Sequence, residues 1–172
     1  MAEATIALPV SLEILRSLRR IVKRVEGASS ELEEAHGITA PQLLCLHALT
    51  RAGSLTQIQL SREVRLAAST VVGVVDRLEA KGLVVRQRDA EDRRRIHVSL
   101  TEAGRSVERA APEPLQLQVE RGLQAMSEER QQAIAAALDR LVHLLEAEHI
   151  DAAPVLTSGV IPQPQDQASP RP

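Results

Sequence analysis

Residues 56–101 read TQIQLSREVRLAASTVVGVVDRLEAKGLVVRQRDAEDRRRIHVSLT and contain two amphipathic segments followed by two short apolar ones. Thr56 precedes Gln59 by three residues, a capping-box pattern that predicts a helix from about Gln57. After a short connection, apolar residues recur at the i, i+3, i+4 and i+7 spacing of a helix that buries one face, namely Val71, Val74, Val75 and Leu78. Gly82 is suited to end that second helix.

The two apolar segments that follow predict a β-hairpin. Residues 83–85 suit a strand, and Ile96, Val98 and Leu100 alternate with polar residues on a period of two. This hairpin carries five arginines, at positions 86, 88, 93, 94 and 95, whose guanidinium groups suit phosphates and a narrow minor groove. Two helices and a charged hairpin in this order predict a winged helix, with the first turn of the second helix in the major groove of double-stranded DNA.

Three alternatives stay open at this point. Two short amphipathic helices joined by a tight turn also occur in ordinary all-α packing. A charged hairpin is also compatible with a solvated surface turn. A winged helix can further serve as a protein-interaction module, in which the hairpin meets an acidic protein surface in place of phosphate, and this alternative would differ from DNA binding in its salt dependence.

The chain resembles the MarR family of winged-helix regulators. Asp92-x-Arg94, followed after five residues by Leu100-Thr101 and then Gly104, resembles the wing signature of that family, and residues 78–84 (LEAKGLV) resemble the exit of its recognition helix. Residues 39–49 and 127–130 fit its flanking helices, so the resemblance covers about residues 10–149. It implies a homodimer with interlocked terminal helices that reads an inverted repeat, and a repressor released by a small molecule or an oxidant.

The predicted DNA-binding residues are Ser69, Thr70, Gly73, Arg77, Arg86, Asp92, Arg93 and Arg94. Arg94 is the minor-groove arginine that the resemblance implies, and Asp92 is expected to pair with a nearby arginine and hold the loop. The chain departs from many members of the family at Val72-Gly73, where they place a hydroxyl and a basic residue. Gly73 costs about 1 kcal/mol of helix stability relative to alanine, and it permits a close approach to the DNA backbone.

Composition narrows the class of nucleic acid. The 172 residues include no Phe, Trp or Tyr, which removes the base-stacking platform of most single-strand binders and the aromatic cages that hold quaternary ammonium ligands. The formal net charge is −2, but residues 57–109 carry eleven Lys and Arg against eight Asp and Glu, a net of +3. Basic charge is therefore concentrated in the predicted lobe, and binding should be salt-sensitive and strengthened by two lobes acting together.

Both flanks predict dimerisation helices. Apolar residues recur there at helical spacing, and the predicted dimerisation residues are Ile14, Leu18, Ile21, Val25, Ile134, Leu138, Leu141 and Leu145. Packing within a single chain is the alternative to a dimer. Pro112 and Pro114 predict a break in the helix that leaves the wing.

We therefore predict a mainly α fold with a small β-hairpin wing, a winged helix-turn-helix flanked by N- and C-terminal dimerisation helices. Residues 1–36 form the N-terminal dimerisation helix and residues 37–110 the DNA-binding lobe. Residues 111–150 form the C-terminal dimerisation helices. Residues 151–172 hold five of the nine prolines and almost no charge, which predicts a disordered tail.

No pattern of an enzyme, a cofactor or a metal site is found. The five histidines lack the i, i+4 pairing of a helical metal site. Cys45 lies in an apolar helix, so a buried structural thiol is preferred over a redox sensor, which stays as an alternative. Without a leader, a membrane-length apolar run or a disulfide framework, we expect a cytoplasmic protein. Its expected partners are double-stranded DNA, a second copy of the chain and a small-molecule effector whose binding residues the sequence does not identify.

Overall fold

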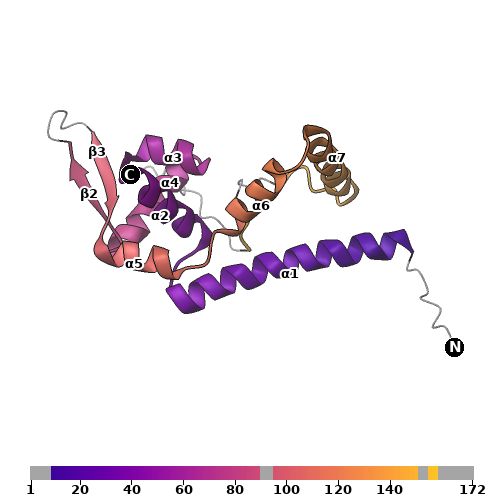
Figure 1. The fold of residues 1–172 in the computed structure, drawn as a ribbon, viewed down its shortest axis with the longest axis horizontal. Helices are drawn as coiled ribbons and strands as arrows, with labels where there is room; N and C mark the ends of the chain where they lie inside the picture. The colour runs from indigo at the N-terminus through magenta and orange to yellow at the C-terminus, as the bar shows by residue number, and fades with distance from the viewer. Residues whose placement is uncertain (1–8, 90–94, 151–154, 159–172) are drawn as a thin grey trace, which may run out of the picture.

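The computed structural model describes residues 9–89, 95–150 and 155–158. Its helices are α1 (Val10–His36), α2 (Ala40–Ala52), α3 (Gln57–Val64), α4 (Ala68–Ala80), α5 (Glu102–Ala110), α6 (Leu115–Gln124) and α7 (Glu128–Leu144). Its strands are β1 (Ser54–Thr56), β2 (Val84–Arg88) and β3 (Ile96–Leu100). Figure 1 shows α2 to α5 and the sheet gathered into a lobe at one end, from which the long α1 and the pair α6 and α7 extend. The predicted mainly α fold with a hairpin wing is confirmed.

The helix-turn-helix forms where the sequence predicts it. The side-chain oxygen of Thr56 accepts a hydrogen bond from the Gln59 N–H (3.3 Å), and the Gln59 side-chain oxygen accepts one from the Thr56 N–H (2.8 Å). These two bonds satisfy donors that the start of α3 would otherwise leave unpaired. The apolar stripe of α4 is fully buried, as its spacing requires, and consists of Val71, Val74, Val75 and Leu78. One face of α4 is therefore fixed in the core and the other is left for solvent or a partner.

The sheet contains a strand that the sequence did not reveal. Its order is β1-β3-β2, and both pairings are antiparallel. β1 has only three residues, and Leu55 pairs with Val98 across more than forty positions of sequence, so no local pattern marks it. The predicted alternation of β3 holds for Val98 and Leu100, which are buried, but Ile96 is exposed because the outer end of β3 extends beyond the core.

A hydrogen-bonded junction joins α4, β3 and α5. The Thr101 hydroxyl donates to the carbonyl oxygen of Gly82 (2.7 Å) and accepts from the N–H of Gly104 (2.9 Å), while the Thr101 N–H donates to the carbonyl oxygen of Leu83 (3.1 Å). Gly82 takes a positive φ of 68°, which a glycine adopts without strain. Gly104 lies so close to the turn that an added Cβ would sit 2.0 Å from the Leu83 carbonyl oxygen. This junction fixes the base of the wing on the end of the recognition helix.

The core lies inside the lobe and includes Cys45. The Cys45 side chain is fully buried, and burial raises the pKa of its thiol from 9.0 to about 12. The nucleophilic thiolate is therefore scarce at neutral pH, and the preferred interpretation of Cys45 as a structural thiol fits this environment. Lys81, at the end of α4, connects that helix to the residues around the start of α2. Its ammonium group donates to the Gly37 carbonyl oxygen and to the Gln42 side-chain oxygen.

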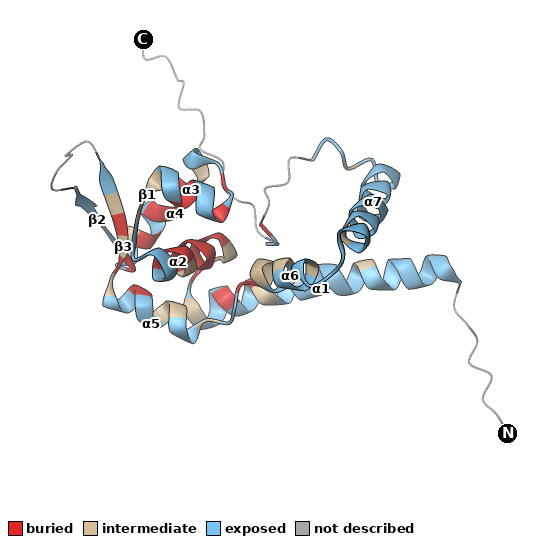
Figure 2. Ribbon diagram, turned by 45° about the horizontal axis from the view of Figure 1, so that its top comes forward, coloured by how far each residue is buried: buried red, intermediate tan, exposed pale blue. Residues whose placement is uncertain are grey.

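Helices outside the lobe bury little in a single chain. The predicted break at Pro112 and Pro114 is present between α5 and α6. Only Ser29 and Leu32 are buried in the 27 residues of α1, and the described residues of α6 and α7 include none that is buried. Figure 2 shows this contrast between the buried lobe and the exposed outer helices.

The tail departs from its predicted disorder at residues 155–158. Val155 is only 7% exposed and belongs to the buried cluster of the lobe. The N–H of Ser158 donates to the Ser29 hydroxyl oxygen on α1 (3.2 Å). Composition predicted a tail without structure, but it cannot show that Val155 has a place in the buried cluster of the lobe.

Gly104→Ala should destabilise the lobe by about 2–3 kcal/mol, because the new methyl group meets the Leu83 backbone, which is not free to move. Urea unfolding at matched protein concentration, followed by circular dichroism, measures this change. Gly122→Ala is the matched control, since a Cβ at Gly122 in α6 meets no atom within 4 Å. A Gly104→Ala variant as stable as the control would contradict the assigned role of the junction.

Candidate nucleic-acid interface

The outward face of α4 presents a short row of side chains beside the wing. Ser69 and Arg77 are exposed, and Thr70 and Gly73 are partly exposed. The N-cap residue of α4 is Ala67, which supplies no side-chain cap, so the first-turn N–H groups and the positive end of the helix dipole are left for an outside acceptor. Hydroxyl groups and uncapped N–H groups at one helix start suit phosphate oxygens and base edges.

Val72 adds an apolar side chain to this face. From the sequence alone, Val72 was notable only because it departs from the pattern of the family. Its side chain is 42% exposed although it lies one residue after the buried Val71. An exposed valine beside polar side chains suits the methyl group of thymine in the major groove. The exposure of Val72 could have been predicted from helical spacing, because Val72 falls outside the buried stripe of α4.

Arg86 links the wing to α4. Its guanidinium pairs with Asp76 (Nη2 to Oδ1, 2.5 Å) and with Glu79, both of which lie on α4. Burial alone would lower the pKa of the Arg86 guanidinium, but hydrogen bonds with Asp76 and Glu79 outweigh it and hold that pKa above its ordinary value. Arg86 is therefore a permanent cation that neutralises two carboxylates on the recognition helix and connects β2 to it.

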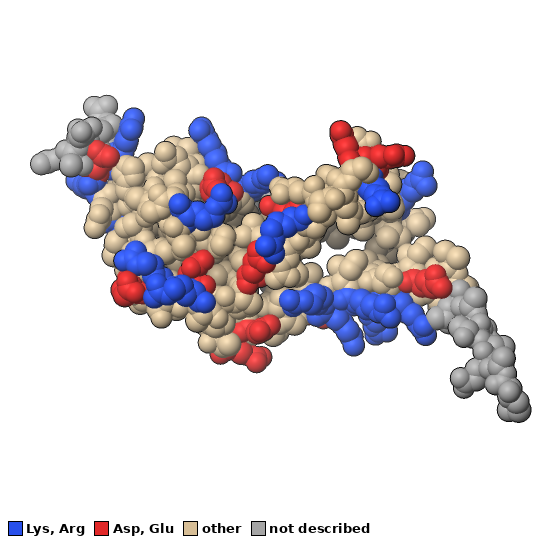
Figure 3. All heavy atoms as spheres, in the orientation of Figure 1, with Lys and Arg blue, Asp and Glu red and all other residues tan. Residues whose placement is uncertain are grey.

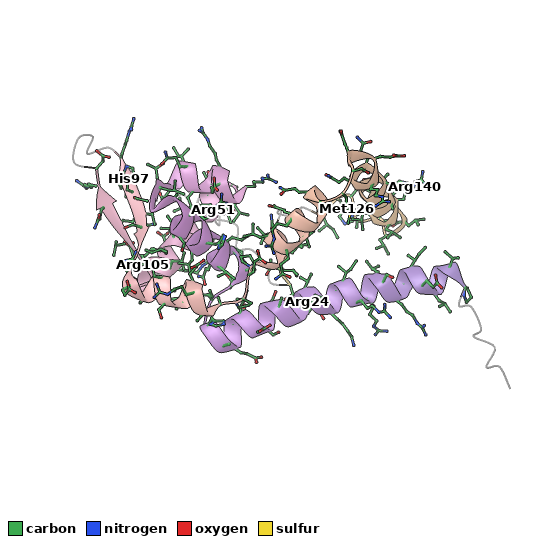
Figure 4. All side chains as sticks on the ribbon, in the orientation of Figure 1. Arg24, Arg51, His97, Arg105, Met126 and Arg140 are labelled. Carbon is green, nitrogen blue, oxygen red and sulfur yellow. The ribbon has the colours of Figure 1, made fainter. Side chains whose placement is uncertain are left out.

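A groove lies where the start of α3 meets β3, the strand that pairs with β1. It is lined by residues 56–59 and by Arg95, Ile96 and His97. Figure 4 labels His97, which lies on β3, and the His97 ring nitrogen Nε2 is 3.1 Å from a carboxylate oxygen of Asp89. The groove therefore combines polar and apolar side chains beside the wing.

The predicted DNA-binding residues divide into three groups. Ser69, Thr70, Gly73 and Arg77 share the outward face of α4. Arg86 is turned toward that helix and engaged by its carboxylates. Asp92, Arg93 and Arg94 lie outside the described residues. Figure 3 shows basic side chains at the wing and also in a row along one side of α1, where Arg16, Arg19, Arg20 and Lys23 are exposed.

The predicted dimerisation residues lie on the outer helices and are partly or largely uncovered. Ile21 on α1 is 54% exposed, and Leu138 on α7 is 47% exposed. Ile14, Ile134 and Leu145 are also exposed, and Leu18, Val25 and Leu141 are partly so. Apolar surface of this extent on two outer helices is typical of an interface with another molecule.

Among the residues that the structure describes, no three or more His, Cys, Asp and Glu side chains gather into a group able to hold a metal ion. Within the same residues, no helix combines the length and apolar character needed to cross a membrane.

Comparison with known proteins identifies the family. Residues 38–96 match the family model described as MarR family. The chain is 33% identical over 109 residues to the uncharacterized HTH-type transcriptional regulator YfiV of Bacillus subtilis, a match that spans 63% of this chain and 68% of YfiV. It is 34% identical over 92 residues to the HTH-type transcriptional repressor MdtR of the same organism, which spans 54% of this chain and 59% of MdtR.

A solved structure agrees with this assignment. The YusO protein from Bacillus subtilis superposes with a TM-score of 0.53 at 28% sequence identity, covering 78% of this chain and 95% of YusO. The chain thus belongs to the MarR family of winged helix-turn-helix transcriptional regulators.

Proposed function

We propose that this regulator acts in the cytoplasm as a homodimeric, ligand-responsive repressor that binds an inverted repeat in double-stranded DNA. Proteins of this family are DNA-binding regulators and not enzymes. The observation that carries the proposal is the outward face of α4, where an uncapped helix start, two hydroxyl side chains and Arg77 lie beside the wing. The relative MdtR is described as a repressor, which supports repression over activation.

Recognition of the DNA base sequence rests on few side chains of α4. Ser69, Thr70 and Arg77 supply hydrogen bonds, and Val72 supplies an apolar contact with a thymine methyl group. Gly73 leaves a gap between these side chains, because a Cβ there would meet no atom within 4 Å. We infer that the DNA backbone fills this gap, and that Arg93 and Arg94 add contacts from the wing.

Two copies of the chain form the functional unit. The uncovered apolar residues of α1 and α7 suit burial against their equivalents in a second copy, since the single chain leaves them in solvent. Two lobes held at a fixed spacing would also compensate for the modest net charge of each lobe, because binding of the first lobe raises the effective concentration of the second.

The two alternative functions are less well supported. A cysteine-based redox switch requires an accessible thiolate, whereas Cys45 is buried with a raised pKa. A protein-interaction module would not need hydroxyl groups and N–H groups at an uncapped start of α4.

Binding to DNA from upstream of its own gene tests the proposal. Fluorescence anisotropy across a range of salt concentrations should give a log–log slope of about −5 if each of two lobes contacts roughly three phosphates. Binding that is absent for every inverted repeat offered, or that does not depend on salt, would favour the protein-interaction alternative.

Gly73→Ala should separate fold stability from DNA affinity. The free energy of unfolding should rise by about 1 kcal/mol, because alanine is the better helix former, while DNA affinity should fall by at least about fivefold, which corresponds to roughly 1 kcal/mol. Gly27→Ala in α1 is the control, since its Cβ is also unobstructed. It should gain stability without losing DNA affinity. Equal DNA affinity of the Gly73→Ala variant and the wild type would contradict a close approach of the DNA backbone.

Arg86→Gln should weaken DNA binding mainly by leaving Asp76 and Glu79 uncompensated on α4. Titration of the DNA should show an affinity lower by about tenfold, or roughly 1.4 kcal/mol, with the dimer intact by light scattering. Adding Asp76→Asn and Glu79→Gln to that variant should restore most of the affinity, because the repulsion is then removed. Arg86 would instead be a direct phosphate contact if the triple variant bound no better than Arg86→Gln alone.

A further inference from the structure

The N-terminal half of α1 carries a row of cations without counter-charges. Residues 14–25 include five Lys and Arg and no Asp or Glu. Four exposed side chains form this basic row, namely Arg16, Arg19, Arg20 and Lys23. Within the part of the chain that the structure describes, none of the four has a hydrogen-bond or ion-pair partner, whereas Arg51, Arg105 and Arg121 are each paired with a carboxylate. Like charges gathered on one helix face repel one another, so an anionic partner stabilises such a face.

The basic row is centred on the side of α1 opposite the predicted dimerisation residues. Because a helix turns by about 100° per residue, the row lies across the helix from Leu18 and Val25. Figures 1 and 3, which share one orientation, show the row on the side of α1 that is turned away from α6 and α7. A second copy that covers the apolar face of α1 therefore leaves the basic row in solvent.

The basic row is also separate from the outward face of α4. Figure 1 shows the N-terminal half of α1 and the wing at opposite ends of the molecule. Glu31 and Glu34 follow on the same face of α1 nearer the lobe, and both are exposed. Their carboxylates repel phosphates and limit an anionic partner to the N-terminal half of the helix. The row is therefore a second basic surface of the molecule.

The spacing and chemistry of the row suit the backbone of a duplex. From Arg16 to Lys23 the helix rises by about 10 Å, a length of duplex that carries about three phosphates of one strand. Three of the four cations are arginines, whose guanidinium groups bind phosphate oxygens in pairs. The chain lacks the aromatic side chains that stack on single strands or anchor helices at a membrane surface. Double-stranded DNA is therefore the polyanion that these features favour.

We propose that the basic row of α1 holds a second segment of duplex DNA by its phosphate backbone, without regard to base sequence. A dimer then brings two stretches of DNA together, one on its lobes and the other on a basic row. The proposal rests on the proposed function for the first stretch, because only the lobes read sequence. With about three phosphates on each row, a doubling of the salt concentration should lower the affinity for the second duplex by about sixfold.

Capture of a second duplex by the full-length protein tests the proposal. DNA from upstream of its own gene is fixed to beads in excess over the protein, so that the lobes are occupied, and a fluorescent duplex of random sequence is added. The wild type should retain this second duplex. A variant that combines Arg19→Gln, Arg20→Gln and Lys23→Gln should retain it about tenfold less, because three phosphate contacts are lost. Its affinity for the fixed DNA should stay within about twofold of wild type.

The combination of Arg105→Gln, Arg109→Gln and Arg121→Gln is the matched control. It removes the same formal charge, but from cations that are already paired with carboxylates, so retention of the second duplex should stay within about twofold of wild type. All six substituted side chains are exposed. Light scattering and circular dichroism should therefore show an intact dimer and fold in both variants.

Equal retention of the second duplex by the wild type and the α1 variant would overturn the proposal, as would an equal loss in the α1 variant and the control. Tighter binding of the wild type to phosphatidylserine vesicles or to polyglutamate than to the random duplex would also overturn it, and would assign the row to a membrane or to an acidic protein. A wild type that did not bind the upstream DNA would refute the proposed function. Anisotropy of the random duplex with the wild type and the two variants would still test the row in that case.

Discussion

The hydroxyl group of Thr101 is the point on which the geometry of the lobe depends. It donates to Gly82 at the end of the recognition helix and accepts from Gly104 at the start of α5. β2 begins and β3 ends beside these two bonds, which together with the Arg86 ion pairs connect the wing to α4. Gly104 is required because the α5 backbone approaches the Leu83 carbonyl too closely for any side chain. A DNA-binding face needs a helix and a hairpin at a fixed angle, and this junction sets that angle.

The residues that carry the family resemblance therefore have mostly structural roles. Lys81, Gly82, Thr101 and Gly104 contact other parts of the lobe, and the side chains that face outward from α4 are different ones. This division is physically reasonable, because regulators with one scaffold must read different operators. Arg86 belongs with the scaffold, since its two carboxylate partners on α4 hold the wing in place and are neutralised in return.

The distribution of burial separates this scaffold from the outer helices. Nearly all buried apolar residues lie in the lobe, whereas α1 and α7 keep apolar side chains in solvent. A second copy would cover them. Between the two parts lies the crevice that Val155 fills.

The sequence by itself determined what depends on near neighbours. Helical spacing placed α4 and its buried face, Thr56 and Gln59 marked the start of α3, and Pro112 with Pro114 marked a break, because each signal is complete within a few residues. The expectation that Ile58 packs with Leu60 and Val64 on the inner face of α3 was wrong for Ile58, which is 61% exposed. Only the tertiary structure decided the pairing of β1 with β3, the engagement of Arg86 by α4, and the burial of Val155 against residues more than a hundred positions away. These contacts join segments that no local pattern connects, and their free energy comes from packing that exists only once the lobe has formed.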